Sequence, residues 1–274
     1  ENIQPQLSRS LLAHQQNARV EELRDAKYQR ILESNPALSL LKGYARFKNQ
    51  NTLLVHKSDG SEEELVADRI LIATGSTPSI PPIKGLVDTP YWTSTEALFA
   101  EELPSSLVVI GSSVVALEIA QAYARLGSRV TILARHTLLY AEDPLLGEKL
   151  AECFEKEGIR VLNNTQASHV SYDSNGFSLE TNEGTLIAEK LLISTGRHAN
   201  TGKLGLENVG VETDKSGAIV VNSMMETSTA NIYAAGDCSN MPQFVYVAAA
   251  AGSRAGINMT GGNVEVFSPN GAGL

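Results

Sequence analysis

A short turn in the middle of the sequence has residues suited to binding a phosphate. Gly111 ends the apolar run Val108–Ile110, and Ser113 and Ala116 take the next two places of a G-x-G-x-x-G/A pattern. Glycine lets the backbone turn tightly, so that N–H groups at the start of the following helix can face a phosphate. Alanine is common at the third place. Serine at the second is a departure, although the Ser113 hydroxyl can still donate to a phosphate. The alternative interpretation is a tight turn without a ligand.

The segments around this turn form a strand–helix–strand pattern. Four apolar residues after the turn recur at helical spacing: Val115, Ile119, Ala122 and Leu126. Gly127 ends the predicted helix, and a second apolar run, Val130–Leu133, follows at once. The pattern predicts a βαβ unit with its first turn at the helix N-terminus, as in dinucleotide-binding units.

The residues after the second strand indicate which dinucleotide binds. Units that bind NAD place Asp or Glu at the end of this strand, where the carboxylate accepts from the ribose 2′-hydroxyl. This sequence has Ala134 there, followed by Arg135. Without the carboxylate nothing repels a 2′-phosphate, and the Arg135 guanidinium can form two parallel hydrogen bonds to it. The sequence therefore favours NADPH, with a solvated arginine at a strand end as the alternative.

A second set of candidate residues follows three other apolar runs, at Thr74-Gly75, Thr195-Gly196 and Gly236-Asp237. A strand that ends in Gly-Asp places a carboxylate at the sheet edge where α/β proteins bind ligands. Asp237 can there accept from a sugar or ribityl hydroxyl. The helix predicted from Gln243 begins just beyond, and its positive end can face an anionic ring or phosphate. An aspartate that only closes a turn or caps a helix is the alternative.

The remaining patterns predict a mixed α/β chain. We expect a polar helix over 10–34, strands near 38–47, 52–57, 64–67 and 69–73, and a crossing segment at 76–85. Thr93 and Glu96 form a capping box for a helix to Ala100, and Asp143-Pro144 starts another helix that Gly158 ends. A strand over 159–162, a β-meander over 167–194, a strand over 231–235 and a helix over 243–258 complete the prediction.

Together these motifs resemble the pyridine nucleotide-disulfide reductases, flavoproteins with two dinucleotide-binding domains. The resemblance is carried by Thr74-Gly75, Gly111–Glu118, Thr195-Gly196-Arg197 and Gly236-Asp237. Within the family the likeness is to the subfamily that reduces mercuric ion, on the runs Pro90–Leu98, Ile110–Ser128 and Ala234–Gly262. Such enzymes pass a hydride from NADPH to FAD and on to a cysteine pair. The resemblance therefore implies reduction of Hg(II) to Hg(0), a detoxification of mercury.

The resemblance also implies a role for each matched residue. For FAD these residues are Gly43, Ala45, Thr74, Gly75, Asp237 and Val245. For NADP they are Gly111, Ser113, Val114, Ala116, Glu118, Arg135 and Gly196. Asp237 would hold the ribityl chain and Val245 would lie beside the flavin ring. Glu118, the one catalytic candidate, would lie near the nicotinamide and the flavin.

The fold implied by the resemblance is α/β, with two Rossmann-like, three-layer ββα domains and the NADP domain inserted in an incomplete FAD domain. We expect residues 1–77 and 197–262 to belong to the FAD domain, 78–196 to form the NADP domain and 263–274 to be a tail. The family's first FAD-binding βαβ unit, its CxxxxC redox pair and its interface domain have no counterpart in this sequence.

We therefore expect a central fragment, with a complete NADP domain and weak or no FAD binding. The intact enzyme would be a homodimer. Another NAD(P)H-dependent disulfide or quinone reductase of the family, and a non-catalytic NADP-binding remnant, are the open alternatives.

Composition limits the other function classes. The 274 residues carry a formal charge of −9 without a Lys/Arg run, which argues against a nucleic-acid partner. No apolar run approaches the length of a membrane span, so we expect no membrane partner and a cytoplasmic setting. The two cysteines fit no redox spacing; we expect Cys153 to be a packing residue and Cys238 to have no redox role. The five histidines show no ligand spacing, so no metal site is expected.

Overall fold

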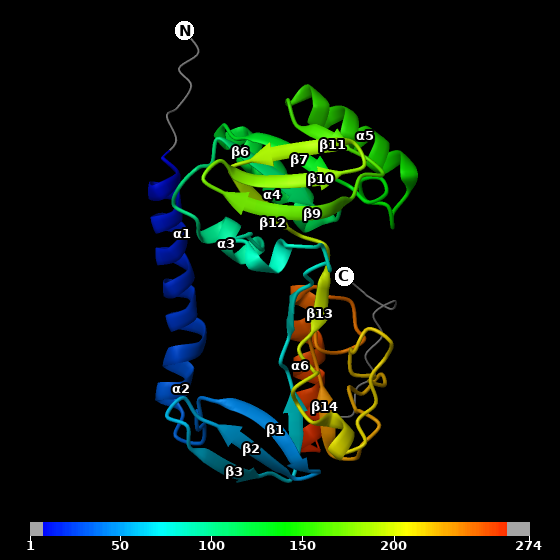
Figure 1. Ribbon diagram of the computed structural model, residues 1–274. Helices are drawn as coiled ribbons and strands as arrows, with labels where there is room; N and C mark the ends of the chain where they lie inside the picture. Colours follow the sequence, from blue (N-terminus) through cyan, green and yellow to red (C-terminus); the bar gives the residue numbers. More distant parts are fainter. Residues whose placement is uncertain (1–7, 262–274) are drawn as a thin grey trace. The chain divides into compact units, whose positions relative to one another are not determined.

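The computed structural model describes residues 8–261 and divides into two compact units (Figure 1). Unit 1 comprises Glu1–Leu38 and Pro78–Gly196, and unit 2 comprises Ser39–Thr77 and Arg197–Leu274, each as far as it is described. The expected tail at 263–274 lies outside the described residues.

Unit 1 is built on a parallel sheet of four strands in the order β12-β6-β7-β8. The strands are β6 (Ser106–Ile110), β7 (Arg129–Leu133), β8 (Arg160–Leu162) and β12 (Lys190–Ile193). In register, Val108 of β6 pairs with Thr131 of β7 on one side and with Leu191 of β12 on the other. The two ends of the predicted βαβ unit are therefore neighbouring central strands.

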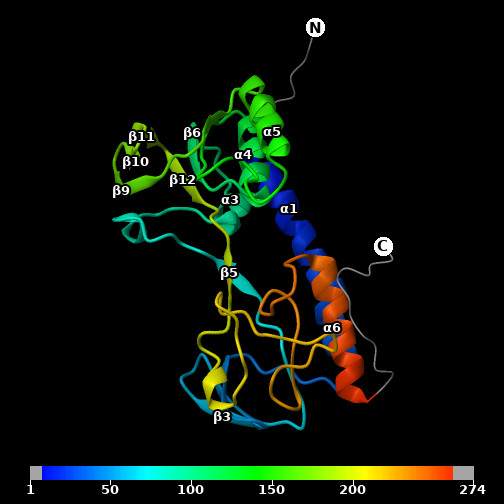
Figure 2. The same cartoon turned by 90° about the vertical axis from the view of Figure 1, so that its right-hand side faces the viewer.

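Two different layers cover the faces of this sheet (Figures 1 and 2). Helices α4 (Val114–Leu126) and α5 (Pro144–Lys156) contact one face, and an antiparallel meander covers the other. The meander strands are β9 (Ala167–Asp173), β10 (Gly176–Thr181) and β11 (Gly184–Ala188). Because side chains alternate along a strand, Leu107 and Val109 pack against the helices while Val108 and Ile110 pack against the meander. The expected three-layer, Rossmann-like fold is confirmed.

Helix α4 buries a face that the spacing of its large apolar residues does not mark. Its buried residues are Ala116, Leu117, Ile119, Ala120 and Tyr123. Of the four residues chosen from helical spacing, only Ile119 is buried, and Val115 and Ala122 are exposed. Small alanines let the helix approach the sheet closely, and the Tyr123 ring belongs to the same core cluster. The helix predicted from the apolar spacing is confirmed, with Gly127 at its C-terminus, and small residues form much of its buried face.

The predicted helix over 10–34 is present but is interrupted. It consists of α1 (Arg9–Arg24), a π-helical segment η1 (Asp25–Gln29) and α2 (Arg30–Ser34), and Asn35 ends it in an extended conformation. Only Ala13 of α1 is buried, and the apolar side chains of Leu23 and Ile31 are exposed. In unit 1, α1 contacts helix α3 (Ser94–Phe99), and η2 (Leu86–Asp88) lies against β9.

As far as residue 261, unit 2 contains three small sheets and one long helix. Strands β1 (Tyr44–Asn49), β2 (Thr52–His56) and β3 (Glu62–Val66) form an antiparallel sheet, and β4 (Ile70–Ile72) pairs in parallel with β14 (Ile232–Ala234). At the boundary with unit 1, β5 (Ser76–Pro78) pairs with β13 (Arg197–Ala199). Helix α6 (Val245–Thr260) buries Val247, Ala251 and Ala255, and η3 (Leu206–Asn208) contacts β1.

None of the helices within residues 8–261 combines the length and apolarity needed to cross a membrane.

Candidate functional site

Gly111 occupies a position where no side chain fits. Its φ is +143°, and a Cβ there would lie 2.1 Å from the Ser194 carbonyl oxygen and 3.3 Å from the Ala116 Cβ. The Gly111 N–H donates to the Leu133 carbonyl at 3.1 Å, and the Ser194 N–H donates to the Ile110 carbonyl at 2.9 Å. The turn is therefore packed between two strands of the sheet and helix α4, which explains why glycine and alanine stand at 111 and 116.

Helix α4 begins at this turn with an open N-terminus. Ser113 is the N-cap residue in an extended conformation, and its side chain makes no capping hydrogen bond. Val114 and Val115 are 56% and 45% exposed, although both are apolar. The first N–H groups of a helix have no intrahelical acceptor, so this end can bind an anion. Glu118 is exposed one turn beyond Val114 on the same side of the helix.

The end of β7 has a buried alanine at the position where NAD-binding units place a carboxylate. The Ala134 side chain is fully buried, its N–H donates to the Leu162 carbonyl, and its carbonyl accepts from the Thr165 N–H, both at 2.9 Å. Arg135 is exposed. The structure thus presents an accessible guanidinium beyond a sealed strand end.

Gly196, the last predicted NADP residue, lies at the end of unit 1. Its φ is +112°, and its carbonyl accepts from the Ser79 N–H at 2.9 Å. Since Ser194 bonds to Ile110 beside the phosphate turn, the segment 194–196 runs next to that turn.

Asp237 in unit 2 is held by a chain of hydrogen bonds from two residues without a predicted role. The Ser76 hydroxyl donates to Asp237 Oδ2 at 2.8 Å, and Arg197 Nε donates to the Ser76 hydroxyl at 2.7 Å. A second Arg197 nitrogen donates to the Ser76 carbonyl at 2.7 Å. Because Arg197 can only donate, the single Ser76 hydrogen is directed at Asp237. Ser76 thereby holds Asp237 through its Oδ2.

The start of helix α6 lies beside the Gly236-Asp237 turn. Gly236 has φ +78°, and a Cβ there would be 3.7 Å from the Cβ of Ala248 in the first turn of α6. The helix begins at Val245, two residues later than predicted, and its N-cap residue Phe244 provides no side-chain cap. Val245 is 85% exposed. A carboxylate and an uncapped helix N-terminus thus lie close together.

The other predicted FAD residues occupy two places. Thr74 and Gly75 are tied to Asn200: the Thr74 hydroxyl donates to the Asn200 carbonyl at 2.8 Å, and the Asn200 N–H donates to the Gly75 carbonyl at 2.9 Å. Gly43 precedes β1, where a Cβ would lie 2.6 Å from the His56 carbonyl, and Ala45 is exposed on β1 opposite Val55.

Sequence reasoning missed Ser76, Arg197 and Asn200. A signal was available, because Ser76 and Arg197 each directly follow a Thr-Gly pair. These two residues begin strands β5 and β13, which pair with each other.

The cysteines have different environments. Cys238 is buried in the core of unit 2, with its sulfur 3.3 Å from the Ala235 carbonyl and 3.5 Å from the Ile72 carbonyl. Cys153 is exposed on α5, so the prediction that it packs in the core is wrong. The buried residues of α5 are Phe154, next to it, and Gly147. Across residues 8–261, no group of three or more His, Cys, Asp and Glu side chains is placed to hold a metal ion.

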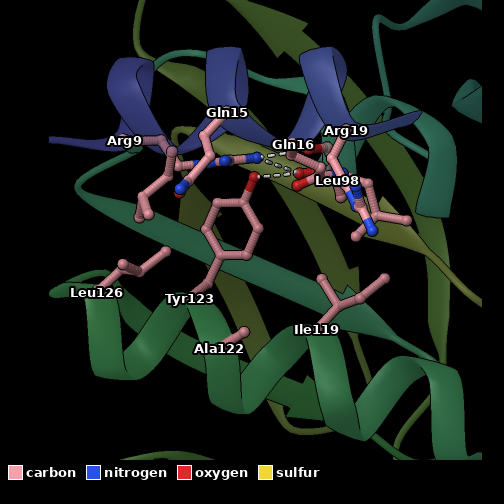
Figure 3. Close-up of a pocket in the computed structure, with 11 residues that line it drawn as sticks. Arg9, Gln15, Gln16, Arg19, Leu98, Ile119, Ala122, Tyr123 and Leu126 are labelled. Atoms are coloured by element: carbon pink, nitrogen blue, oxygen red, sulfur yellow. Dashed lines mark hydrogen bonds between the residues drawn. The ribbon is translucent and has the colours of Figure 1, made fainter. Parts of the chain in front are cut away.

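An apolar pocket between α1, α3 and α4 contains none of the predicted site residues (Figure 3). Arg9 of α1 donates to the Leu98 carbonyl at 2.6 Å, and the Tyr123 hydroxyl donates to the Ala97 carbonyl at 2.6 Å. Burial raises the pKa of Tyr123, which keeps its hydroxyl a donor. Together the two side chains bond to the carbonyl end of α3 and join α1 to the rest of unit 1. We therefore interpret this pocket as part of the packing between α1, α3 and α4.

Residues 2–252 match the model of the pyridine nucleotide-disulphide oxidoreductase family. The chain belongs to this family. Members of the pyridine nucleotide-disulphide oxidoreductases use FAD and NAD(P)H, the two cofactors predicted from the sequence.

Several curated relatives of the chain are mercuric reductases. One from Shewanella putrefaciens is 75% identical over 97% of this chain and 48% of its own length. One from Acidithiobacillus ferrooxidans is 57% identical over 96% of this chain and 48% of its own length. The chain therefore spans about half the length of these relatives.

Solved structures of other family members share the fold. The HOCl-induced flavoprotein disulfide reductase RclA from Escherichia coli superposes with a TM-score of 0.86 at 29% identity, over 96% of this chain and 59% of that one. LpdA from Mycobacterium tuberculosis gives a TM-score of 0.82 at 28% identity, over 96% of this chain and 59% of LpdA.

Proposed function

We propose that this chain provides the pyridine-nucleotide site and part of the flavin site of an NADPH-dependent enzyme that reduces Hg(II) to Hg(0). The observation that carries the proposal is the 75% identity to a mercuric reductase over 97% of the chain. The proposal places the intact enzyme in the cytoplasm as a homodimer, without membrane or nucleic-acid partners.

In the NADPH site, each predicted site residue of unit 1 has a physical role. The phosphate turn of Gly111, Ser113, Val114 and Ala116 holds the pyrophosphate with backbone N–H groups of α4. Arg135 pairs with the 2′-phosphate, and Gly196 lines the groove beside the turn. Glu118, exposed on the first turns of α4, faces the nicotinamide end of the groove.

In the flavin site, the residues of unit 2 position and stabilise a ribityl chain and an anionic ring. Asp237, held by Ser76 through its Oδ2, accepts from a ribityl hydroxyl. The uncapped N-terminus of α6 favours negative charge, and Val245 gives it an apolar surface. Thr74 and Gly75 approach the pyrophosphate of FAD, and Gly43 and Ala45 approach its adenosine through their backbone.

When bound, FAD supplies two-electron chemistry between the nicotinamide and a cysteine pair, and two electrons convert Hg(II) to Hg(0). Neither Cys153, exposed in unit 1, nor Cys238, buried in unit 2, is proposed to take part.

A segment exchange tests the proposal directly. The chain would replace the matching segment of the mercuric reductase from Shewanella putrefaciens, and NADPH oxidation dependent on Hg(II) would be measured. We expect the exchanged enzyme to retain flavin and most of the activity of its parent. A folded, flavin-loaded exchanged enzyme that does not respond to Hg(II) would contradict the proposal.

Disulfide reduction is the second candidate, because RclA, a disulfide reductase, shares the fold with a TM-score of 0.86. The same exchanged enzyme can be assayed with disulfide substrates. Faster turnover of a disulfide than of Hg(II), relative to the parent enzyme, would favour this candidate.

A further inference from the structure

The loop 135–142, which follows β7 and begins with Arg135, is attached to the phosphate turn by a strained residue. The Leu139 N–H donates to the Ser112 carbonyl at 2.9 Å, and Leu139 has φ +48°. Residues other than glycine, asparagine and aspartate rarely adopt this left-handed conformation, and it persists where surrounding contacts impose it. This hydrogen bond joins the loop to the phosphate turn, in addition to the bond from the Gly111 N–H to the Leu133 carbonyl at the end of β7.

Other contacts fix the same loop from behind. The His136 carbonyl accepts from the Asn164 N–H at 2.8 Å. Leu138 is buried, and its carbonyl lies so close to helix α5 that a Cβ on Gly147 would come within 2.1 Å of its oxygen. Arg135 remains exposed, and Tyr140 is 66% exposed with its ring 4.7 Å from that of His136. The backbone of the loop is thus fixed while its polar and aromatic side chains face solvent.

We propose that Leu139 is a positioning residue for the choice between NADPH and NADH. Its left-handed backbone holds the loop that begins with Arg135 against the phosphate turn. NADPH engages both parts at once, through its 2′-phosphate and its pyrophosphate, whereas NADH engages only the turn. Preorganisation of the loop therefore favours NADPH alone. This inference depends on the proposed function of unit 1 as an NADPH site.

Two substitutions at Leu139 separate a backbone role from a packing role. Leu139 is partly buried against the core of unit 1. Leu139→Val keeps an apolar side chain but disfavours positive φ, whereas Leu139→Asn loses the apolar packing against this core but tolerates positive φ. We expect Leu139→Val to weaken NADP⁺ binding about tenfold and NAD⁺ binding by less than about twofold, since strain of this kind is worth a factor of ten or more. Leu139→Asn should bind both nucleotides about as the unchanged chain does. The opposite order would show a packing role and overturn the proposal.

A glycine pair provides an independent test away from the ligand. Gly147→Ala places a methyl group against the Leu138 carbonyl, so it should displace the loop and lower NADP⁺ affinity several-fold with little change for NAD⁺. Gly256→Ala, in helix α6, meets no atom within 4 Å and should change neither affinity. Alanine by itself favours a helix over glycine, so any loss of affinity would come from the displaced loop. An unaltered nucleotide preference in Gly147→Ala would therefore contradict the proposal.

Amide exchange of the nucleotide-free chain distinguishes failure of this inference from failure of the proposed function. The Leu139 N–H should be protected in the unchanged chain, and the N–H of residue 139 should be protected in Leu139→Asn but exchange rapidly in Leu139→Val. An unprotected amide in the unchanged chain would overturn the attachment itself. A protected amide in a chain that binds neither nucleotide would instead overturn the proposed NADPH site.

Discussion

At the residue scale, Gly111 shows how a ligand-binding turn constrains its own sequence. The residue has positive φ, and the Ser194 carbonyl occupies the space that a Cβ would need. Backbone freedom and close packing both require glycine, so the turn cannot change without disturbing the sheet. Ser113, in contrast, is exposed at the N-cap, where a hydroxyl meets no steric limit. The departure from the glycine pattern therefore falls where the structure tolerates a side chain.

A substitution pair measures this constraint. We expect Gly111→Ala to lower the free energy of unfolding of unit 1 by about 3 kcal/mol, from the left-handed backbone and the forced packing shift together. Gly184→Ala is the matched control, because its φ is +103° but no atom lies within 4 Å of the added Cβ. It should cost only about 1–2 kcal/mol. Urea unfolding monitored by circular dichroism gives both values. Equal losses would show that the contact with Ser194 is unimportant.

Arg135 carries the prediction of cofactor choice. Arg135→Glu should weaken NADPH binding by a factor of about 100 or more, because a bidentate charged pair is replaced by like-charge repulsion, and NADH binding much less. Arg135→Lys, which keeps the charge but not the fork, should give an intermediate loss for NADPH. Titration of the chain with each nucleotide, followed by nicotinamide fluorescence, measures the ratio. An equal loss for both cofactors would refute the assignment.

At the scale of elements, local sequence signals place most ends correctly. The capping box predicted at Thr93 and Glu96 is present: the Thr95 N–H donates to the Thr93 hydroxyl, and Glu96 accepts from the Thr93 N–H at 2.7 Å. Asp143 caps α5 through the Leu145 N–H at 2.9 Å, with Pro144 as the first helical residue. These signals succeed because a cap depends on residues within one turn of each other.

The capping box also predicts an acid dependence. Partial burial alone would raise the pKa of Glu96, but hydrogen bonds from the Thr93 hydroxyl and N–H outweigh it and hold that pKa below its ordinary value of 4.5. A carboxyl with a lowered pKa in the folded state stabilises the fold above its ordinary pKa and loses this contribution as the pH falls through the lowered value. Thr93→Ala should cost about 1 kcal/mol at neutral pH. Glu96→Gln should keep most of the cap but lose the dependence below pH 4.5, as measured by thermal unfolding between pH 3 and pH 7. An unchanged acid dependence in Glu96→Gln would show that another group is responsible.

At the scale of the whole molecule, the parallel sheets of the two units differ in their number of strands. In unit 1 the four parallel strands have helices on one face and a meander on the other. In unit 2 the parallel pair of β4 and β14 is a sheet of two strands. Parallel strands are stable in larger sheets that are covered on both faces, so this pair is a weak framework for a cofactor.

This difference predicts separate responses to the two cofactors. NADP⁺ at 100 times its dissociation constant should stabilise unit 1 by about 2.7 kcal/mol and raise the midpoint of one thermal transition by roughly 5–10 °C. FAD should bind the chain weakly and leave both midpoints within about 1 °C, since stabilisation requires a ligand in excess of its dissociation constant. Differential scanning calorimetry with each cofactor checks this. A purified chain with stoichiometric yellow flavin would contradict the second expectation.

The sequence alone determined the elements and turns whose causes are local. Alternating apolar residues specify strands, caps specify helix ends, and a position such as 111 requires glycine. The tertiary structure decided what depends on distant partners. Ser76 meets Asp237 across 161 residues and Arg197 across 121, the alanines of α4 are selected by the distance to the sheet, and Cys153 is exposed because Phe154 fills the core. Leu139 belongs to the same class. Its conformation is unfavourable by itself. It is held by the bond to the Ser112 carbonyl and by the packing of the preceding Leu138 against Gly147, so no local pattern could reveal it.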